Sequence, residues 1–450
     1  MSRIAPLSGF PEWQPPQRMI EQRVLDHLRT TFELYGFAPL QTRAVEPLDQ
    51  LLRKGETSKE VYVLRRLQEA PDQPGSGGGR PEEQLGLHFD LTVPFARFVL
   101  ENAGKLQFPF RRYQIQQAWR GERPQEGRYR EFTQADIDVV DRGSLPFHYE
   151  VEIPLIIGDA LSGLPVPPVR VHVNNRKLAQ GFYRGVGIGD VEAALRAVDK
   201  LDKIGPDGVA ELLAATAGAS QAQAKACLAL AEIATADASF VDAVRALGVS
   251  DPLLDEGLAE LVRVVDAAGE HNPGLLLADL KIARGLDYYT GTVYETTMVG
   301  YERVGSICSG GRYDNLATSG DQSYPGVGIS LGVSRMLGVL FGASALTVSR
   351  SVPTCVLVAL PSDEHRAECD RVAAALRRRG IPTEVSPSAD KYGRQIRFAQ
   401  RRGIPYVWFP GVDGAPDEVK DIRSGDQVGA DRTLWAPPQE DLHPTIAASA

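Results

Sequence analysis

The sequence has 450 residues, 43% of them apolar and 24% charged, with a net charge of −9. A chain of this length exceeds one compact core, so two or three domains are expected, and no apolar run approaches the ~20 residues of a membrane span. Four scattered cysteines without a CxxC pair, and the lack of an HExxH motif, argue against a disulfide framework, a zinc site and a protein-held catalytic metal. With no apolar signal region at the N-terminus, the composition predicts a cytoplasmic protein.

The first predicted element is an amphipathic helix in PQRMIEQRVLDHLRTTFELYG. Ile20, Val24, Leu28 and Phe32 share one face, prolines precede the segment and Gly36 closes it. Residues 69–84 are rich in Gly and Pro and contain GSGGG. We interpret them as a flexible surface loop rather than a phosphate loop, because no strand enters the segment and no GK[ST] follows.

Residues 85–175 contain the β-prone runs LGLHFDLTV, RRYQIQQAWR, FTQADIDVV and VPPVRVHVN, with a helix near 94–103. Residues 176–275 are instead dominated by alanine and leucine, which predicts a helical insertion, and strands return from 276. Strands grouped between helices predict an α+β domain with a mostly antiparallel sheet and flanking helices. Its two parts would cover residues 1–175 and 276–345.

The C-terminal residues, 351–440, alternate strand-like and helix-like segments after a linker-like stretch at 340–353. PTCVLVALP and IPYVWF are buried strand candidates. Between them lies a helix with Ser362 as candidate N-cap and Gly380 as C-cap. The βαβαβ order predicts a small α/β domain with a parallel sheet.

A negative net charge is not typical of a nucleic-acid-binding protein, but six arginines lie within residues 111–130. Two β-prone runs flank the loop there, so several guanidinium forks converge near one mouth of the sheet and suit phosphate oxygens. Along the second run Phe132, Gln134, Asp136 and Asp138 point to one face, which is costly to bury without a polar partner. A solvated hairpin with surface salt bridges is the alternative.

Three further stretches place polar residues inside apolar surroundings. LHFDLTVPF carries Asp90 and Thr92, ARGLDYYTGTVYE (283–295) carries Arg284 and two tyrosines, and YPGVGISLGVSRML leads to Arg335. The glycines of SGG and GVG allow close approach of a backbone or ligand. Asp90 as a turn or cap residue, and the tyrosines as a core ladder, are the structural alternatives. Taken together, arginines for a phosphate chain, acids for an amine and tyrosines for a polar ring predict ATP-dependent activation of an amino acid.

RGLDYYTGTVYE and SGGRYDNL resemble the histidyl-tRNA synthetase family of class II aminoacyl-tRNA synthetases, over nearly the whole chain. DLTVPFAR and QADID are similar to its eukaryote-like branch. The resemblance implies formation of histidyl-adenylate and pyrophosphate from L-histidine and ATP, with Mg²⁺ bound to ATP, and then transfer of histidine to the 3′ end of its tRNA. It also implies a homodimer, an insertion that touches the tRNA acceptor arm, and a C-terminal anticodon-binding domain.

The resemblance assigns the catalytic roles to two arginines, Arg120 and Arg284. Arg120 would hold the α-phosphate and the histidine carboxylate, and Arg284 would stabilise the charge that develops at phosphorus. The remaining histidine-binding positions would be Asp90, Leu91, Thr92, Gln134, Asp138, Tyr288 and Tyr289. Within this set Asp90, Thr92 and Gln134 would receive the amino group, and Asp138 and Tyr289 the imidazole nitrogens.

For ATP the resemblance implies contacts by Arg120, Glu122, Arg128, Phe132 and Arg335, with Phe132 and Arg335 on either side of the adenine. For tRNA it implies contacts by Arg123 and Gln125.

Three positions depart from the family pattern. Thr42–Arg43–Ala44 lacks the usual motif 1 proline, which concerns the dimer interface, Thr133 replaces an aromatic or His, and Ser334 replaces the Glu beside the motif 3 arginine. Two other functions stay open: a synthetase-like regulatory paralogue of histidine biosynthesis, and a stand-alone amino-acid ligase. Neither would need the C-terminal domain.

Overall fold

The computed structural model describes residues 5–52, 60–65, 84–282, 289–411 and 414–449. The chain divides into two compact units, one of residues 1–11 and 25–339 and one of residues 12–24 and 340–450. Helices α1 (Pro15–Leu34) and α11 (Val333–Gly342) contain residues of both. Within the described ranges, no helix is both long and apolar enough to cross a membrane.

The first unit is built on a nine-stranded sheet, ordered β1-β5-β6-β14-β11-β10-β7-β9-β8. Strand pairs are antiparallel except β1 with β5 and β7 with β9, which are parallel. The mostly antiparallel sheet predicted from the sequence is therefore confirmed. Its strands are β1 (Ala38–Pro39), β5 (Phe110–Trp119), β6 (Glu131–Val140), β7 (Val169–Asn175), β8 (Ala234–Thr235), β9 (Leu276–Asp279), β10 (Tyr289–Met298), β11 (Cys308–Tyr313) and β14 (Gly326–Gly332).

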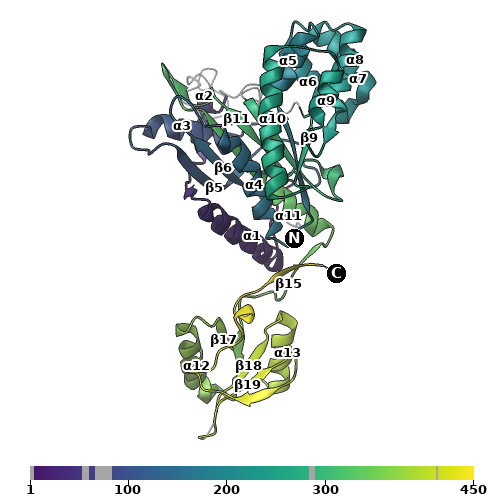
Figure 1. Ribbon diagram of the computed structural model, residues 1–450. Coiled ribbons are helices and arrows are strands. Elements are labelled where there is room, and N and C mark those ends of the chain that lie inside the picture. Colours follow the sequence, from purple (N-terminus) through teal and green to yellow (C-terminus); the bar gives the residue numbers. More distant parts are fainter. Residues whose placement is uncertain (1–4, 53–59, 66–83, 283–288, 412–413, 450) are drawn as a thin grey trace. The chain divides into compact units, whose positions relative to one another are not determined.

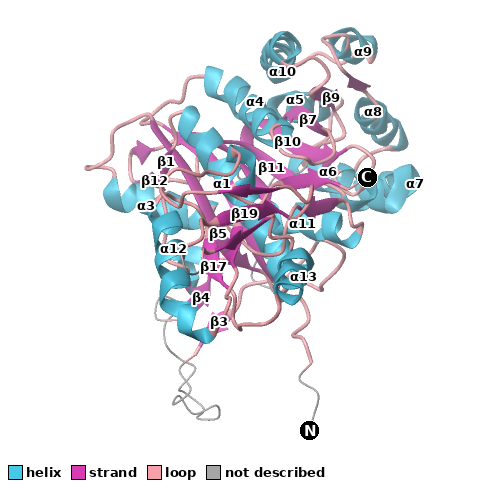
Figure 2. Ribbon diagram, turned by 90° about the horizontal axis from the view of Figure 1, so that it is seen from below, coloured by secondary structure: helices cyan, strands magenta, loops and turns pink. Residues whose placement is uncertain are grey.

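Helices cover this sheet and form the insertion. Helices α4, α5 and α10 pack against β7, β9 and β10 (Figure 2), and α5 to α10 gather at one end of the unit (Figure 1). Alanine-rich helices of this kind follow from the shift in composition after residue 175. The helices are α2 (Leu48–Leu51), α3 (Thr92–Asn102), α4 (His148–Ser162), α5 (Arg176–Gly185), α6 (Val191–Val198), α7 (Leu201–Ala217), α8 (Gln221–Ala231), α9 (Phe240–Ala246) and α10 (Pro252–His271).

The hairpin of β5 and β6 is the longest pairing in the sheet and sets the position of the polar residues. Its register runs from Phe110 opposite Val140 to Trp119 opposite Glu131. Alternate residues therefore face the same side over ten pairs, and the face that carries Gln134 also carries Asp136 and Asp138. Smaller pairings complete the unit: β2 (Val45–Pro47), β3 (Val63–Leu64) and β4 (Leu85–Leu87) form one sheet, and β12 (Thr318–Ser319) pairs with β13 (Gln322–Ser323).

Two local predictions in this unit are corrected. The run LGLHFDLTV is only partly a strand, since β4 ends at Leu87 and α3 begins at Thr92. Asp90 explains the change, because its Oδ1 accepts a hydrogen bond from Val93 N at 3.1 Å and so caps the helix start. In the ARGLDYYTGTVYE stretch, β10 begins at Tyr289, and residues 283–288 lie outside the described residues.

The second unit has a five-stranded sheet ordered β17-β16-β18-β19-β20. Its elements are β16 (Val356–Val358), α12 (Arg366–Arg378), β17 (Thr383–Val385), α13 (Tyr392–Arg402), β18 (Tyr406–Phe409), β19 (Glu418–Asp421) and β20 (Gln427–Gly429). β16, β17 and β18 are parallel, as predicted, but β19 and β20 join antiparallel, so the sheet is mixed rather than parallel.

Two further expectations for this part of the chain are wrong. Residues 340–353 are not a plain linker, because α11 continues to Gly342 and β15 (Leu346–Val348) pairs with β21 (Ile446–Ala448). Ser362 does not cap α12: it precedes a 3₁₀ turn, and its hydroxyl bonds the side chains of Glu364 and His365. Gly380 does adopt the left-handed conformation expected after a helix, with φ of 79°.

Candidate active site

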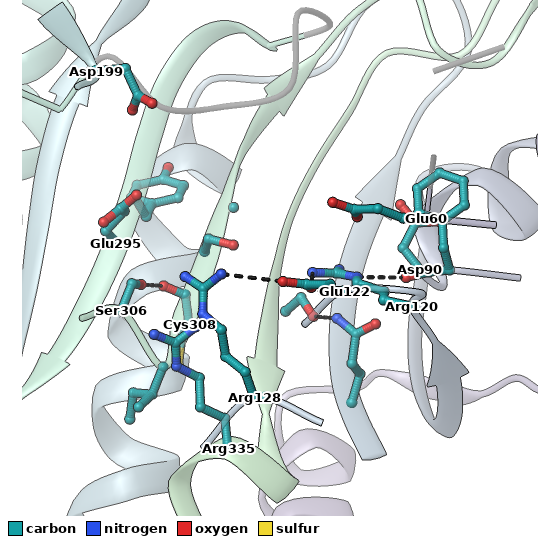
Figure 3. Close-up of a pocket in the computed structure, with 18 of the residues that line it drawn as sticks. Glu60, Asp90, Arg120, Glu122, Arg128, Asp199, Glu295, Ser306, Cys308 and Arg335 are labelled. Carbon is teal, nitrogen blue, oxygen red and sulfur yellow. Dashed lines mark hydrogen bonds and ion pairs between the residues drawn. The ribbon is translucent and has the colours of Figure 1, made fainter. Parts of the chain in front are cut away.

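A cavity of about 700 Å³ lies over the nine-stranded sheet and is lined by residues of β6, β10, β11, β14, the β5–β6 loop and the insertion. Figure 3 shows its labelled side chains: Glu60, Asp90, Arg120 and Glu122 lie together on one side, and Glu295 and Ser306 lie across from them. Arg128 and Arg335 extend between the two groups. The cavity thus has a cationic centre with acids around it.

Arg120 follows β5 and its side chain is fixed by three neighbours. Its Nε donates to the Phe89 carbonyl at 3.0 Å, and its Nη1 lies 3.7 Å from Glu122 Oε1. The guanidinium also lies over the Phe132 ring, 5.1 Å from the centroid. One fork of the guanidinium is therefore anchored, while the residue lines the cavity and is about one-third exposed (33%). An anchored guanidinium is a ready site for a phosphate or carboxylate.

Glu122 and Glu60 place two carboxylates beside Arg120. Glu122 Oε2 accepts from Arg128 Nη1 at 3.3 Å, and the Glu60 carbonyl accepts from Gly121 N at 2.8 Å, which holds Glu60 against the β5–β6 loop. Burial, and then the charge of Glu122, raise the pKa of Glu60 above its ordinary value. An incoming cation would favour the charged form of Glu60.

The two unusual residues Thr133 and Ser334 contact each other. Thr133 N donates to Ser334 Oγ at 2.8 Å, and Ser334 is buried at the start of α11. This bond joins β6, next to Phe132, to the helix that carries Arg335. The Arg335 guanidinium itself donates to the Val304 carbonyl. The departures therefore form one connection between the two side chains predicted to flank adenine.

Asp138 lines a second, smaller pocket together with Thr92, Asp136, Tyr289 and Ser330, of which Tyr289 and Ser330 also line the main cavity. Its Oδ2 lies 2.7 Å from Arg112 Nη2, and its Oδ1 accepts from the Tyr313 hydroxyl at 2.7 Å. Asp138 and Arg112 are 3% and 0% exposed. The carboxylate is thus held as a buried ion pair at the wall of this small pocket, which Tyr289 also lines.

Glycines of the SGG and GVG segments make room for this arrangement. A Cβ on Gly328 would lie 2.1 Å from Asp138 Oδ1, and a Cβ on Gly310 would lie 2.2 Å from the Gly328 carbonyl. The two glycines are neighbours on β14 and β11. The close approach predicted from the paired glycines is between protein groups, and it lets the Asp138 carboxylate lie against Gly328 of the neighbouring strand.

Asp136 is the most deeply buried carboxyl on this face, at 1% exposed. Burial raises its pKa to about 7; Arg112 opposes the rise, while Asp138 and Asp90 add to it. Its Oδ1 accepts no hydrogen bond from the described residues. Sequence reasoning noticed its orientation but gave it no role.

A ladder of amides continues the polar face along β5. Arg112 Nη1 donates to Gln114 Oε1 at 3.3 Å, and Gln114 Nε2 donates to Gln116 Oε1 at 2.7 Å. Gln116 Nε2 then donates to the Thr42 carbonyl at 3.0 Å, and Gln114 Nε2 also reaches Thr42 Oγ1 at 3.0 Å. Each amide oxygen accepts from the residue nearer Arg112, and each amide NH₂ donates to the next group along the strand. All hydrogen bonds of the ladder therefore run in one direction, away from Arg112.

A buried carboxylate on α4, Glu150, anchors the strand that carries Tyr289. Its Oε2 accepts from Thr292 N at 3.1 Å and Thr292 Oγ1 at 2.6 Å, and its Oε1 accepts from Arg312 Nη1 at 2.8 Å. The register of β10 against β11 shifts between Tyr289 and Val293 at this point. The irregularity predicted at Thr290–Gly291 is confirmed, and Glu150 fixes it.

The insertion contributes the remaining wall of the cavity. Arg176 of α5 pairs with Glu192 of α6 at 2.5 Å, and four more insertion residues line the cavity: Leu195, Arg196, Asp199 and Lys200. Cys308 of β11 also lines it, but burial raises the pKa of its thiol to about 12, so it is a poor nucleophile.

The structure brings most of the predicted residues together. The main cavity is lined by Asp90, Arg120, Glu122, Arg128, Phe132, Gln134, Tyr289 and Arg335, and the second, smaller pocket by Thr92 and Asp138. Leu91 is fully buried and lines neither, and Arg123 and Gln125 are exposed on the β5–β6 loop away from the lining. Arg284 and Tyr288 lie outside the described residues.

Sequence reasoning missed other residues near this site, among them Glu60, Arg112, Glu150, Glu295 and Ser330. For Arg112 a signal existed, since it lies on the same strand face as Gln114 and opposite Asp138. Glu150 and Ser330 have no comparable signal, because their partners are far away in the sequence.

Comparison with known proteins gives a consistent result. Residues 9–336 match the family described as histidyl-tRNA synthetase, and residues 354–428 match an anticodon binding domain. The histidine–tRNA ligase of Cutibacterium acnes is 59% identical over 454 residues, covering 99% of both chains. That of Micrococcus luteus is 58% identical over 455 residues, again with 99% of each covered.

Solved structures agree. The crystal structure of histidyl-tRNA synthetase from Nostoc sp. PCC 7120 has a TM-score of 0.83 at 32% identity, covering 96% of this chain and 98% of that one. A structure described as an ATP phosphoribosyltransferase regulatory subunit/histidyl-tRNA synthetase from Bacillus halodurans C has a TM-score of 0.69 at 19% identity, covering 87% and 96%, and shows a shared fold alone. By sequence and fold, the chain belongs to the histidyl-tRNA synthetase family.

Proposed function

We propose that this chain is a histidine–tRNA ligase, which makes histidyl-adenylate from L-histidine and ATP and passes the histidine to the 3′ end of its tRNA. The observation that carries the proposal is the convergence of three arginines, Arg120, Arg128 and Arg335, with Gln134 and Asp138 around two cavities that share lining residues. The full-length identity to histidine–tRNA ligases supports it.

The first step needs positioning and positive charge more than proton transfer. The carboxylate of histidine attacks the α-phosphate in line, and negative charge develops on the phosphoryl oxygens. Arg120 is proposed to hold both reacting groups, and Arg284 to stabilise the developing charge from the other side. Mg²⁺ would arrive with ATP on the pyrophosphate oxygens. Within the described residues, no cluster of His, Cys, Asp and Glu is suited to hold a metal of its own.

The substrate contacts follow from where each side chain lies. Gln134, Asp90 and Thr92 are proposed to receive the amino group, and Asp138 with Tyr289 and Tyr288 the imidazole ring. Leu91 is fully buried, so it would contribute through its backbone. For ATP, Phe132 and Arg335 would stack on the adenine, and Glu122 and Arg128 would contact the phosphates and the ion they carry.

The tRNA contacts are proposed from exposure and charge. Arg123 and Gln125 lie exposed on the β5–β6 loop, where an acceptor end could reach them. The insertion is proposed to contact the acceptor arm. On α13, three exposed arginines at helical spacing, Arg394, Arg397 and Arg401, form a stripe suited to anticodon phosphates. A homodimer in the cytoplasm is the proposed working form.

Pyrophosphate exchange and tRNA charging test the proposal separately. Histidine-dependent ATP–pyrophosphate exchange should occur without tRNA, and histidine should become attached when its tRNA is added. Absence of exchange would reject the ligase and favour a regulatory paralogue. Exchange without charging would favour a stand-alone ligase. The match of residues 354–428 to an anticodon binding domain supports the synthetase over both.

Arg284→Ala tests the proposed role of the segment that lies outside the described residues. Exchange should fall to background while circular dichroism and the melting temperature stay near the wild-type values. Retained exchange would remove Arg284 from the proposed mechanism. Arg303→Ala is a matched control, because Arg303 pairs with Glu126 at the surface and lines no part of the cavity.

A further inference from the structure

Gln134 has a defined amide orientation in this structure. Its Nε2 donates to Ser330 Oγ at 2.5 Å, while its Oε1 is buried and accepts no hydrogen bond from the described residues. Gln134 is 7% exposed and lines the cavity. An ammonium group needs an acceptor, so only this orientation of the amide suits the amino group of an amino acid.

Ser330 is the group that fixes this orientation, and Asp136 fixes Ser330. Ser330 on β14 lies directly opposite Asp136 on β6, and both side chains line the same small pocket. Hydrogen bonding from the Ser330 hydroxyl lowers the pKa of the Asp136 carboxyl. A hydroxyl has one proton, and a carboxylate can only accept it. With its proton committed to Asp136, the Ser330 oxygen is left to accept, and it accepts from Gln134 Nε2.

The environment of Asp136 keeps its carboxyl an acceptor. Arg112 Nη2 lies 4.0 Å from Asp136 Oδ2, and Arg112 remains paired with Asp138 at 2.7 Å. The charged groups that face Asp136 are therefore one arginine and two acids, Arg112, Asp138 and Asp90. A bound ammonium would add positive charge and favour the carboxylate form.

We propose that Asp136 is a positioning residue for amino-group recognition: through the Ser330 hydroxyl it holds the Gln134 amide with its oxygen available to the substrate. The inference rests on the proposed function, in which Gln134 receives the amino group of histidine. In this arrangement Asp136 acts on the amino group through Ser330 and Gln134, and its own side chain lines the small pocket beside Asp138. It acts by a chain of donors and acceptors, Gln134 to Ser330 to Asp136, of the same kind as the amide ladder along β5.

Substitutions separate this role from a purely structural one. Asp136→Ala removes the acceptor, so the Ser330 proton can turn toward Gln134 and allow the amide to flip. Asp136→Asn is the matched control, because its amide oxygen can face Ser330 and Arg112, which both donate. Ser330→Ala breaks the chain at its middle. In the double variant Asp136→Ala, Ser330→Ala, the loss of Asp136 should not raise the histidine KM beyond its value in Ser330→Ala.

The assay is ATP–pyrophosphate exchange at pH 8, above the pKa of about 7 that burial gives Asp136. Asp136→Ala should raise the KM for histidine about tenfold with the KM for ATP within about twofold, and Asp136→Asn should stay near wild type. Inhibition by 3-(imidazol-4-yl)propanoate, which lacks the amino group, should change less than the histidine KM in every variant, because Asp136 and Ser330 also line the pocket proposed for the ring. Ser330→Ala and the double variant should have equal histidine KM values.

Three results would overturn the inference. The first is a histidine KM in the double variant that equals the product of the two single effects. The second is an equal rise of the histidine KM in Asp136→Ala and Asp136→Asn. The third is a loss of deamino-analogue binding as large as the loss of histidine binding. If Asp136→Ala does not fold, Ser330→Ala alone decides: an unchanged histidine KM rejects the chain of hydrogen bonds. Lack of exchange by the wild-type protein would instead reject the proposed function.

Discussion

The two sheets of this protein bury different kinds of side chain. In the second unit, β16 is Val356–Val358 with every residue buried, and β18 carries the buried Trp408 in a core with Cys369 and Leu376. In the first unit, the buried face of β5 and β6 carries Arg112, Gln114, Gln134, Asp136 and Asp138. One sheet is stabilised by packing, and the other buries charges that packing alone would exclude.

The cost of that difference is large. Removing an ion from water costs several kcal/mol even after relaxation, and apolar replacements of buried ion pairs are often neutral or stabilising. A sheet built only to fold would have no reason to keep Arg112 and Asp138 at 0% and 3% exposed. The polar sheet therefore indicates a ligand site, and the apolar sheet a scaffold. Substitutions on the two sheets should separate activity from stability.

The largest effect on activity is expected for Arg120→Ala. Its loss removes the guanidinium proposed to hold the α-phosphate, so pyrophosphate exchange should fall by about 10²–10³-fold with little change in the melting temperature. Arg123→Ala is the control on the same loop: exchange should be unchanged, and only tRNA charging should weaken. A variant of Arg120 with normal exchange would contradict the comparison, since the polar side chain would then have no function.

Gly328→Ala tests the close approach inside the polar sheet. The new Cβ would lie 2.1 Å from Asp138 Oδ1, and the carboxylate cannot retreat because Arg112 and Tyr313 hold it. The histidine KM should rise at least about tenfold, and unfolding free energy should fall by about 2 kcal/mol. Gly104→Ala, where a Cβ meets nothing within 4 Å, is the control. Equal behaviour of the two variants in exchange and in denaturant unfolding would remove Gly328 from the site.

The sequence predicted the polar face well because period two is a local property of a strand. Gln134, Asp136 and Asp138 alternate along one run, and Arg120 and Arg128 flank one turn, so their grouping follows from the hairpin. The helical insertion was likewise predictable, since composition changes sharply at residue 176. The family resemblance added the residue roles that no pattern contains.

Contacts between distant segments were not predictable. Thr133 and Ser334 were seen as two separate departures, yet they are 201 positions apart and hydrogen-bonded. Glu150 meets Thr292 across 142 positions, and nothing in the helix HYEVEIPLIIGDALS marks one glutamate as an anchor. For Asp90 the two roles considered from the sequence do not exclude each other: its side chain makes a helix-capping hydrogen bond and also lines the cavity. Such cases depend on tertiary packing, which one strand or helix does not encode.

Glu150→Gln tests a buried charge that supports the site without lining it. Thr292 and Arg312 both donate hydrogen bonds to the Glu150 carboxylate. A glutamine has one oxygen and must direct its NH₂ at one of these two donors, so one of the hydrogen bonds that the carboxylate accepts is lost. We expect a loss of about 2 kcal/mol in unfolding free energy and a severalfold rise in histidine KM through the displaced Tyr289.

Glu152→Gln on the same helix is the control: its pair with Arg111 is partly exposed, so the loss should stay below about 1 kcal/mol. Denaturant unfolding and exchange kinetics measure both effects, and a loss in Glu152→Gln as large as in Glu150→Gln would show that burial does not matter there.

The smallest effect is expected for charges at the rim of the apolar sheet. Arg423 bonds Asp421 and Asp441, at 2.7 Å to each, and lowers the pKa of both carboxyl groups. A lowered carboxyl pKa adds stability above the unfolded value near 4, and this stability is lost as the pH falls through the lowered pKa. Arg423→Gln should therefore cost roughly 1 kcal/mol above pH 5 after solvent screening, and the cost should shrink as the pH falls through the lowered pKa of the two carboxyl groups. Hydrogen exchange of peptides from residues 350–449, measured from pH 7 to 3, reports the loss, while pyrophosphate exchange should be unchanged. Arg378→Gln, at the exposed end of α12 and without an ion pair among the described residues, is the control, and its acid sensitivity should match wild type. If Arg423→Gln instead reduced pyrophosphate exchange as strongly as Arg120→Ala, the division between a polar sheet for chemistry and an apolar sheet for support would fail.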